Sequence, residues 1–365
     1  MELTTQNILK ALSTVDDPDI KKDLVTLNMI KDVEIKGTDI SFTVVLTTPA
    51  CPLKEKIKQD CIKAVLELFP ESEVAVNMTA DVTSIMKDLT PDLPEVKNVI
   101  AICSGKGGVG KSTVSANLAI ALAKTGATVG LLDADIYGPS VPIMFGCEDD
   151  KPGVVEEDGK SKIIPIVKHG VKLISIGFLT SEESAVIWRG PMASSALRQF
   201  IGDCKWGALD YLLVDLPPGT SDIHLSLVQS VPVTGALVVS TPQKVALADA
   251  KKAISMFNQK QINVPILGLV ENMAYFTPEE LPDNKYYIFG KGGARELAKE
   301  KEFPFLGEIP LVQGIREGGD NGDPIVLKEG NEQKAFTHVA SELARQIAIR
   351  NASQLETRKV EITSM

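Results

Sequence analysis

Residues 103 to 113 decide the fold of this chain, and they read Cys103-Ser104-Gly105-Lys106-Gly107-Gly108-Val109-Gly110-Lys111-Ser112-Thr113. The stretch contains the pattern G-x-x-x-x-G-K-[ST], set between a strand-like run at 98–102 and a helix-like run at 114–124. Glycines at these positions let the backbone curl so that successive N–H groups point at one phosphate, and the positive end of the following helix adds to the attraction. We therefore expect a phosphate-binding loop, with an ordinary glycine-rich turn as the alternative.

The residues of this loop have separate expected roles toward a nucleotide. Lys111 reaches the β- and γ-phosphates, and the Ser112 hydroxyl is a ligand of Mg²⁺. The predicted ATP-binding residues of the loop are Gly105, Lys106, Gly107, Gly108, Val109, Gly110, Lys111, Ser112 and Thr113.

Acidic side chains follow two other predicted strands. Asp133 and Asp135 come directly after an apolar run at 128–132, and Asp215 closes another at 211–215. Ligands of parallel sheets collect beyond the carboxyl ends of the strands, so one site gathers these groups with the loop. We expect Asp133 and Asp215 to hold Mg²⁺ and Asp135 to order the attacking water. The alternatives are a turn-forming Asp-x-Asp and a strand-ending aspartate that caps the next turn.

Beyond residue 98, apolar runs of strand length alternate with helical patterns. Strands are predicted at 98–102, 128–132, 172–176, 211–215, 235–240 and 264–270, and helices at 114–124, 193–200, 223–229, 246–259, 295–300 and 335–349. Runs rich in β-branched residues and leucine suit strands buried on both faces. The pattern predicts an α/β domain over 98–350, with a mostly parallel sheet and helices on both faces, followed by a flexible tail at 351–365.

The first 88 residues follow a different pattern. A helix is predicted at 5–13, a hairpin of two strands at 33–35 and 40–46, a helix at 57–69 and a third strand at 73–78. This order is typical of a small α+β domain. A proline-interrupted, polar segment at 89–97 is the predicted linker.

Composition limits the classes of partner and compartment. The net charge of -10 argues against a general binder of nucleic acid or of anionic membranes, so neither is an expected partner. The start of the chain shows no basic segment followed by an apolar one, so no secretory signal is expected. The five cysteines are odd in number and widely spaced, which suits reduced thiols in the cytoplasm.

The segment 106–113 resembles the deviant Walker A form of the MinD, ParA and nitrogenase iron protein group of P-loop NTPases. In that group the additional lysine, here Lys106 by position, reaches across a dimer interface to the partner's nucleotide. A second cation at the transferring phosphate stabilises the charge of the transition state. The resemblance implies a homodimer in which ATP hydrolysis is slow, depends on dimerisation and uses Lys106, Lys111 and Asp135 as catalytic residues.

Further segments are similar to the Mrp/ApbC iron-sulfur carrier ATPases within that group. They are 132–140, 188–192, 215–222, 271–273, 288–290 and 315–320. The similarity implies a cytoplasmic carrier or assembly factor that passes iron-sulfur clusters to apo-protein clients. It also implies contacts to adenine from the Asn272 side chain and from Pro310, although an ordinary turn asparagine is the alternative at 272.

The small domain looks like the SufT/PaaD-like domain that accompanies iron-sulfur assembly factors, on the segments 17–20, 24–30 and 47–52. Within it Cys51 precedes a proline at a strand-to-helix junction, where unpaired N–H groups lower the pKa of a thiol. Cys51 is therefore the candidate iron-sulfur ligand, and a buried cysteine in a turn is the alternative.

The chain departs from the family's pattern at the residues that bind the iron-sulfur cluster. Many members of the family carry C-x-x-C between the segments at 271–273 and 288–290, whereas this chain has no cysteine from 272 to 290. Glu279, Glu280 and Asp283 are hard oxygen donors that match iron-sulfur iron poorly. The usual ligands of a shared cluster are absent, which leaves an ATP-switch adaptor without a cluster as one alternative function. A MinD/ParA-like positioning ATPase is another, and the acidic charge counts against it.

Two aromatic pairs, Tyr275-Phe276 and Tyr286-Tyr287, flank the loop that lacks the cysteines. They fit a dimer or client surface and core packing equally well.

Overall fold

The computed structural model of the chain describes residues 2–84, 92–157, 159–179, 190–278, 280–281 and 283–353, with backbone alone at 179 and 190. The chain divides into two compact units, one formed by residues 1–83 with 348–355 and the other by the remaining residues. Trp188, Arg189, Glu279 and the part of the predicted tail from residue 354 onward lie outside the described residues.

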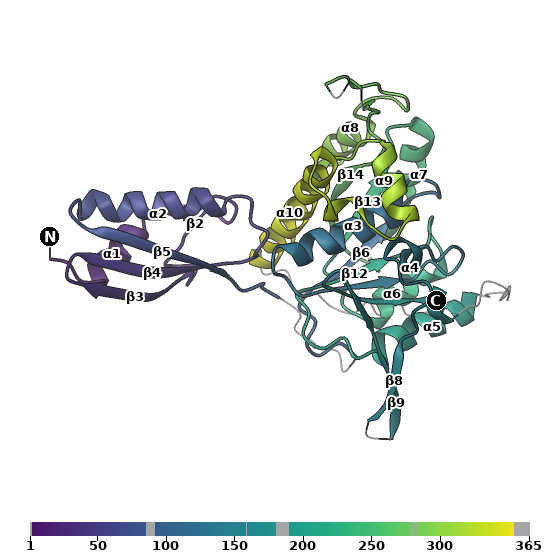
Figure 1. The fold of residues 1–365 in the computed structure, drawn as a ribbon, viewed down its shortest axis with the longest axis horizontal. Coiled ribbons are helices and arrows are strands. Elements are labelled where there is room, and N and C mark those ends of the chain that lie inside the picture. Colours follow the sequence, from purple (N-terminus) through teal and green to yellow (C-terminus); the bar gives the residue numbers. More distant parts are fainter. Residues whose placement is uncertain are drawn as a thin grey trace. The chain divides into compact units, whose positions relative to one another are not determined.

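An eight-stranded sheet forms the centre of the second unit (Figure 1). The strand order is β10-β11-β7-β12-β6-β13-β14-β15, in which β10 pairs antiparallel with β11 and every other pairing is parallel. The strands are β6 (Val99–Cys103), β7 (Val129–Asp133), β10 (Ile166–Lys168), β11 (Val171–Ser175), β12 (Tyr211–Asp215), β13 (Gly235–Ser240), β14 (Ile266–Glu271) and β15 (Phe305–Glu308). The predicted mostly parallel sheet is confirmed.

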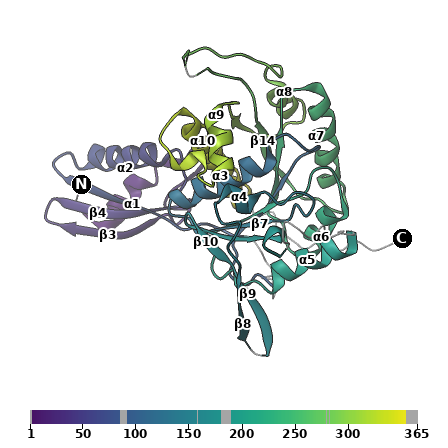
Figure 2. The same ribbon diagram turned by 45° about the vertical axis from the view of Figure 1, so that its right-hand side comes forward.

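Helices cover both faces of this sheet (Figures 1 and 2). Residues of α5, α6, α7 and α8 join one buried cluster on one face, whereas α3 packs on the middle strands from the other. On the side of α3, α10 packs against β15, where Val339 lies beside Gly307. The helices are α3 (Lys111–Lys124), α4 (Val141–Met144), α5 (Gly190–Gly202), α6 (Asp222–Ser230), α7 (Lys244–Phe257), α8 (Gly293–Glu300), α9 (Gln313–Asp320) and α10 (Asn331–Ala352).

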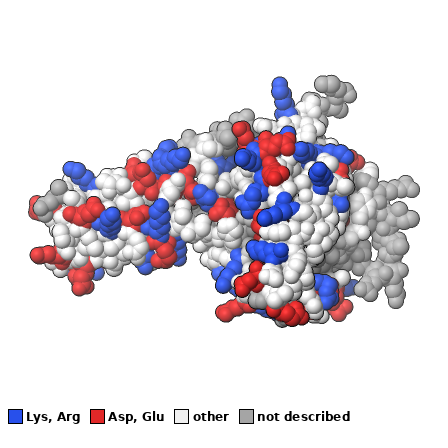
Figure 3. All heavy atoms as spheres, turned by 90° about the horizontal axis from the view of Figure 1, so that it is seen from above, with Lys and Arg blue, Asp and Glu red and all other residues white. Residues whose placement is uncertain are grey.

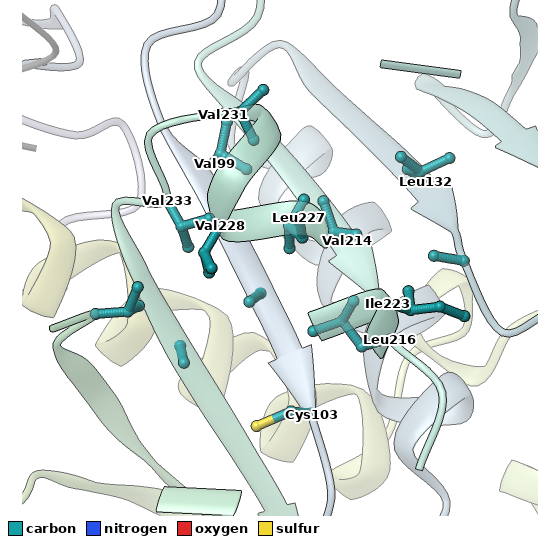
Figure 4. Packing of buried hydrophobic residues seen from close by; sticks show 14 of the residues in the cluster. Val99, Cys103, Leu132, Val214, Leu216, Ile223, Leu227, Val228, Val231 and Val233 are labelled. Carbon is teal, nitrogen blue, oxygen red and sulfur yellow. The ribbon is translucent and has the colours of Figure 1, made fainter. Parts of the chain in front are cut away.

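The core under α6 holds the carboxyl ends of β6 and β12 beside each other (Figure 4). Val99 and Cys103 of β6, Val214 of β12 and Leu227 of α6 have no exposed surface. Full burial of one aliphatic side chain of this size contributes about 1.5–3 kcal/mol. The packing therefore fixes where the loop after β6 begins, next to Asp215 at the end of β12.

The sequence pattern did not predict the hairpin of β8 (Gly153–Glu157) and β9 (Lys160–Ile164), nor the edge strands β10 and β15. Neither strand of the hairpin has a buried residue, so no alternation of buried and exposed positions marks it. The 3₁₀ helices η1 (Ile176–Leu179) and η2 (Ile325–Leu327) were also not expected. The hairpin and the strands β10 and β15 lie at the edge of the eight-stranded sheet or outside it, whereas Ile176 and Phe178 of η1 and Val326 of η2 are buried.

The first unit contains a three-stranded sheet, in the order β3-β4-β5, with two helices. β3 and β4 form an antiparallel hairpin, and β5 pairs parallel with β4 after the chain has passed through α2. Alternate residues of β4 are buried, which matches the expected strand with one face on a core. The elements are α1 (Thr5–Leu12), β1 (Asp16–Asp17), β2 (Lys22–Asp23), β3 (Ile30–Lys36), β4 (Asp39–Leu46), α2 (Lys54–Leu68) and β5 (Glu73–Ala80).

The segment predicted as a linker, 89–97, is described from residue 92. Leu93 and Val96 are buried in the cluster of the second unit, and Lys97 N–H donates to the Leu209 carbonyl at 2.9 Å. This part of the segment is therefore packed onto the second unit. Among the described residues, no helix combines the length and the hydrophobicity needed to span a bilayer.

Candidate functional site

The loop between β6 and α3 surrounds a cavity of about 210 Å³ at the carboxyl edge of the sheet. Gly108 and Gly110 adopt φ angles of +79° and +76°, a region that side chains with a Cβ rarely enter. No side chain caps the start of α3, so backbone N–H groups of its first turn are left to face the cavity. The lining is Ser104, residues 106–113, Asp135, Ser140, Met144 and Pro218.

A buried ion pair lies at the base of this cavity. Lys111 Nζ is 2.8 Å from Asp215 Oδ2, and the Ser112 hydroxyl donates to the same oxygen at 2.6 Å. The Ser115 hydroxyl donates to Asp215 Oδ1, also at 2.6 Å. Burial alone would lower the pKa of Lys111, but the charge and hydrogen bond of Asp215, together with the charges of Asp135 and Asp133, outweigh burial and raise that pKa. Lys111 is therefore a permanent cation placed where a phosphate would enter.

Asp133 lies directly opposite Asp215 in the register of β7 and β12. Its Oδ2 accepts hydrogen bonds from the Ser175 hydroxyl at 2.8 Å and from Val141 N–H at 3.4 Å, and its Oδ1 accepts one from Asp135 N–H at 3.1 Å. Burial, and then the charge of Asp215, raise the pKa of Asp133 to about 7. The surrounding donors hold the Asp-x-Asp turn in place.

Asp135 reaches the same cavity from the far end of that turn. Its Oδ2 is 3.7 Å from Lys111 Nζ, while its Oδ1 is buried and accepts no hydrogen bond from any described residue. Burial raises the pKa of Asp135, although Lys111 acts in the opposite direction. A buried oxygen without a donor is costly unless water or a ligand supplies one.

Lys106 differs from the other loop lysine in being half-buried and unpaired. Its carbonyl accepts a hydrogen bond from the Ser104 hydroxyl at 3.0 Å, but its ammonium group has no ion pair within the described part of the chain. The side chain also lines the phosphate cavity. It is therefore the cation of this loop that remains available to a second molecule.

The two predicted adenine contacts lie in different surroundings. The Asn272 amide is buried and donates to the Val109 carbonyl at 2.8 Å, and a Cβ placed on Gly110 would lie 2.3 Å from Asn272 Nδ2. Pro310 lines a separate cavity of about 770 Å³. Asn272 thus braces the phosphate loop directly.

Three further polar residues lie near the site. Ser115 follows Ser112 at helical spacing, which is a signal that the sequence offered; Ser175 reaches Asp133 only through the pairing of β11 with β7. His224 of α6 accepts a hydrogen bond from Ser221 N–H at 3.2 Å, and its Nε2 is buried with no partner among the described residues. Burial lowers the pKa of His224 to about 4, so the ring is neutral near pH 7.

All five cysteines are described, and no disulfide joins any of them. Burial raises the pKa of Cys61, Cys103 and Cys204 to about 12 and that of Cys147 to about 11, which keeps these four as thiols rather than thiolates. Cys51 alone is partly exposed, in the turn between β4 and α2.

Two protein-family models match the chain. The model described as NUBPL iron-transfer P-loop NTPase matches residues 95–348. The chain belongs to this family. The model described as iron-sulfur cluster assembly protein matches residues 5–78, in the first unit. Both resemblances predicted from the sequence, for the large domain and for the small one, are confirmed.

Two curated relatives are similar along nearly the whole chain. The iron-sulfur cluster carrier protein of Synechocystis sp. is 51% identical, with 95% of this chain and 99% of the relative covered. The iron-sulfur cluster carrier protein of Deinococcus radiodurans is 49% identical, with 95% and 97% covered. A nucleotide-binding protein from Archaeoglobus fulgidus, solved in complex with ADP, is 41% identical with a TM-score of 0.55 over 65% of this chain and 93% of that one.

Proposed function

We propose that this chain is a cytoplasmic ATPase that binds ATP with Mg²⁺ at residues 105–113, hydrolyses it slowly as a homodimer and carries iron-sulfur clusters to apo-proteins. The observation that carries the ATPase part is the arrangement of Lys111, Ser112 and Asp215 at the start of α3, where no described side chain caps the first backbone N–H groups of the helix. Family membership supports the carrier part, because relatives that are 51% and 49% identical to this chain bear that name.

The residues at the cavity fit Mg²⁺. The Ser112 hydroxyl and Asp215 Oδ2, which are 2.6 Å apart, are hard oxygen donors of the kind this ion prefers. When bound, the ion neutralises charge on the β- and γ-phosphates. Ser112 and Asp215 would hold it. Asp133 was predicted to join them, but its two oxygens already accept hydrogen bonds from protein donors, which supports a positioning role through the Asp-x-Asp turn.

Lys111, Asp135 and Lys106 have different roles in hydrolysis. The Lys111 ammonium group moves from the Asp215 carboxylate to the phosphate oxygens, so it pairs with an anion before and after ATP binds. Asp135 Oδ1, which accepts no hydrogen bond from any described residue, accepts one from the attacking water. This hydrogen bond orients the water toward phosphorus. Lys106, which has no partner within the described residues of its own protomer, reaches the nucleotide of a second protomer and stabilises the charge of the transition state.

A second candidate is an ATP-switch adaptor that holds no cluster. It is favoured by one observation, namely that four of the five cysteines are buried and no cysteine lies between 272 and 290. A positioning ATPase on DNA or membrane has less support, because the net charge of the chain is -10. On the face seen in Figure 3, acidic and basic side chains are interspersed. Partners of that kind need a broad basic patch.

Anaerobic reconstitution of the full chain with iron and sulfide separates the carrier from the adaptor. We expect visible charge-transfer absorbance and passage of the cluster to an apo-protein. Cys51→Ser should lose both properties, since Cys51 is the partly exposed cysteine. Cys147→Ser is the matched control, because a hydroxyl keeps the hydrogen bond that the thiol gives to the Pro142 carbonyl. A wild-type protein that stays colourless would establish the adaptor, and a coloured Cys51→Ser variant would remove Cys51 as ligand.

A further inference from the structure

Residues 216–221, which we call the β12–α6 loop, lie against the phosphate loop. Leu216 N–H donates to the Ile102 carbonyl of β6 at 3.0 Å. Pro218 lines the phosphate cavity, and a Cβ placed on Gly107 would lie 3.9 Å from Pro218 Cγ. The β12–α6 loop contains no charged side chain. Any effect that it has on a bound nucleotide therefore comes from where its backbone lies.

The middle of the β12–α6 loop holds the backbone of the phosphate loop. Gly219 N–H donates to the Ser104 carbonyl at 2.9 Å, and the Ser104 hydroxyl donates to the Lys106 carbonyl at 3.0 Å. Gly219 makes this contact at a φ angle of +85°, in a region that glycine enters readily. Two hydrogen bonds in series thus connect Gly219 with the lysine that we assign to the nucleotide of a second protomer.

The far end of the β12–α6 loop is anchored by His224. Ser221, the N-cap of α6, donates its N–H to His224 Nδ1 at 3.2 Å, and the two residues form a capping box. The imidazole has no exposed surface, and its centre lies 6.3 Å from the centre of the Phe257 ring of α7. Because the ring is neutral and Nδ1 accepts a hydrogen bond, the proton of the ring lies on Nε2.

The second ring nitrogen indicates that His224 does more than stabilise the fold. Nε2 is buried and has no hydrogen-bond partner among the described residues. An unpaired buried donor costs more free energy than one neutral hydrogen bond, here the bond from Ser221, returns. A leucine would fill the same space without that cost, and Ser221 would still begin α6. The imidazole adds an acceptor that fixes where the β12–α6 loop ends.

We propose that His224 is a positioning residue for ATP hydrolysis. By fixing one end of the β12–α6 loop it keeps Gly219 on the phosphate loop, and this contact sets the direction in which the Lys106 side chain leaves that loop. The inference rests on the proposed ATPase activity and on the proposed role of Lys106. ATP binding does not depend on this route, because Lys111 is held by Asp215 instead. Loss of the acceptor should therefore slow hydrolysis and leave the affinity for ATP unchanged.

Single-turnover hydrolysis and calorimetric titration with ATP, both on the full chain, test this role. His224→Leu fills the space of the ring without an acceptor, so we expect the rate constant of hydrolysis to fall about tenfold while the Kd for ATP stays within about twofold. His224→Asn places an oxygen close to the position of Nδ1 and should return the rate constant to within about threefold of wild type. His338→Leu, at an exposed position, is the control and should change neither quantity. Undiminished hydrolysis in His224→Leu, or no recovery in His224→Asn, would overturn the inference.

A double-variant cycle tests the route through Lys106. In the Lys106→Ala background, His224→Leu should lower the rate constant no further, and an additive loss would overturn the route. Gly219→Ala disturbs the β12–α6 loop without entering the core, because the added Cβ would meet no atom within 4 Å beyond its chain neighbours, and it should also slow hydrolysis alone. Normal hydrolysis in Gly219→Ala would overturn the inference even if His224→Leu failed to fold. A wild-type chain that does not hydrolyse ATP would overturn the proposed function as well, whereas an active wild type with an equally active His224→Leu would overturn this inference alone.

Discussion

The phosphate loop and the aromatic lobe, by which we mean the described residues of 274–291, both follow parallel strands at the carboxyl edge of one sheet, but opposite interactions hold them. Beneath the loop, Lys111 and Asp215 are buried charges that pair with each other. In the lobe, Tyr286 and Tyr287 are 46% and 38% exposed, and backbone hydrogen bonds fix their positions. The difference indicates that the loop is built to exchange internal partners for a ligand, whereas the lobe is built to keep its shape.

The largest expected effect comes from removing the cation of the buried pair. Lys111→Ala leaves Asp215 without its countercharge, so we expect the free energy of unfolding to fall by about 3–5 kcal/mol and ATP binding to be lost. Denaturant titration and calorimetry measure these two quantities. The double variant Lys111→Met with Asp215→Leu should recover the stability without the binding, and undiminished ATP affinity in Lys111→Ala would refute the assignment of the loop.

Lys106 provides the second test, since it is the lysine of the loop that lacks an internal partner. Lys106→Ala should keep ATP binding within a few-fold of wild type and lower kcat by roughly 10³-fold, as for loss of an arginine finger. Phosphate release in single turnover and a calorimetric titration separate the two effects. Lys63→Ala, an exposed lysine of α2, is the control for loss of one positive charge. Normal turnover in Lys106→Ala would show that hydrolysis needs no second protomer's lysine.

The third test uses the buried ring beside the phosphate site. Burial lowers the pKa of His224 to about 4, below its unfolded value, so the unfolded chain binds more protons between these two values. Stability from this group is therefore present above about pH 6.5 and is lost as the pH falls, by about 2 kcal/mol at pH 5. His224→Gln should flatten the stability profile between pH 4 and 6.5, whereas the exposed His338→Gln should not. If the stability profile of His224→Gln were the same as that of the wild type, His224 would not be the cause of the pH dependence.

The smallest expected effect concerns the base of the aromatic lobe. Glu271→Gln replaces one accepting oxygen with an amide donor that faces a backbone N–H, which costs about 1 kcal/mol. We expect faster hydrogen exchange in residues 274–291 and unchanged ATP affinity. Glu296→Gln, in the first turn of α8, controls for loss of a charge near that helix. If the Glu271 variant lost ATP binding as well, the structure of the phosphate loop would depend on the hydrogen bonds at the base of the lobe.

The sequence predicted those site residues that are marked by a motif or by the end of an apolar strand. The loop residues follow one motif, and Asp133 and Asp215 close recognisable apolar strands, so their common edge was foreseeable. The contact of Asn272 with the Val109 carbonyl was not, because it joins residues 163 positions apart and depends on how β14 ends beside the loop. Ser175 was missed for the same reason, since only strand register brings it to Asp133. The β8–β9 hairpin left no signal because neither strand has a buried residue.

The contact between Asn272 and the phosphate loop has a mechanical consequence. The amide of Asn272 is fixed on the Val109 carbonyl, and the next residue, Met273, turns the chain into the aromatic lobe with a φ angle of +53°. We therefore expect a displacement of the phosphate loop by an arriving or departing phosphate to be passed through Asn272 to the start of the segment that follows β14.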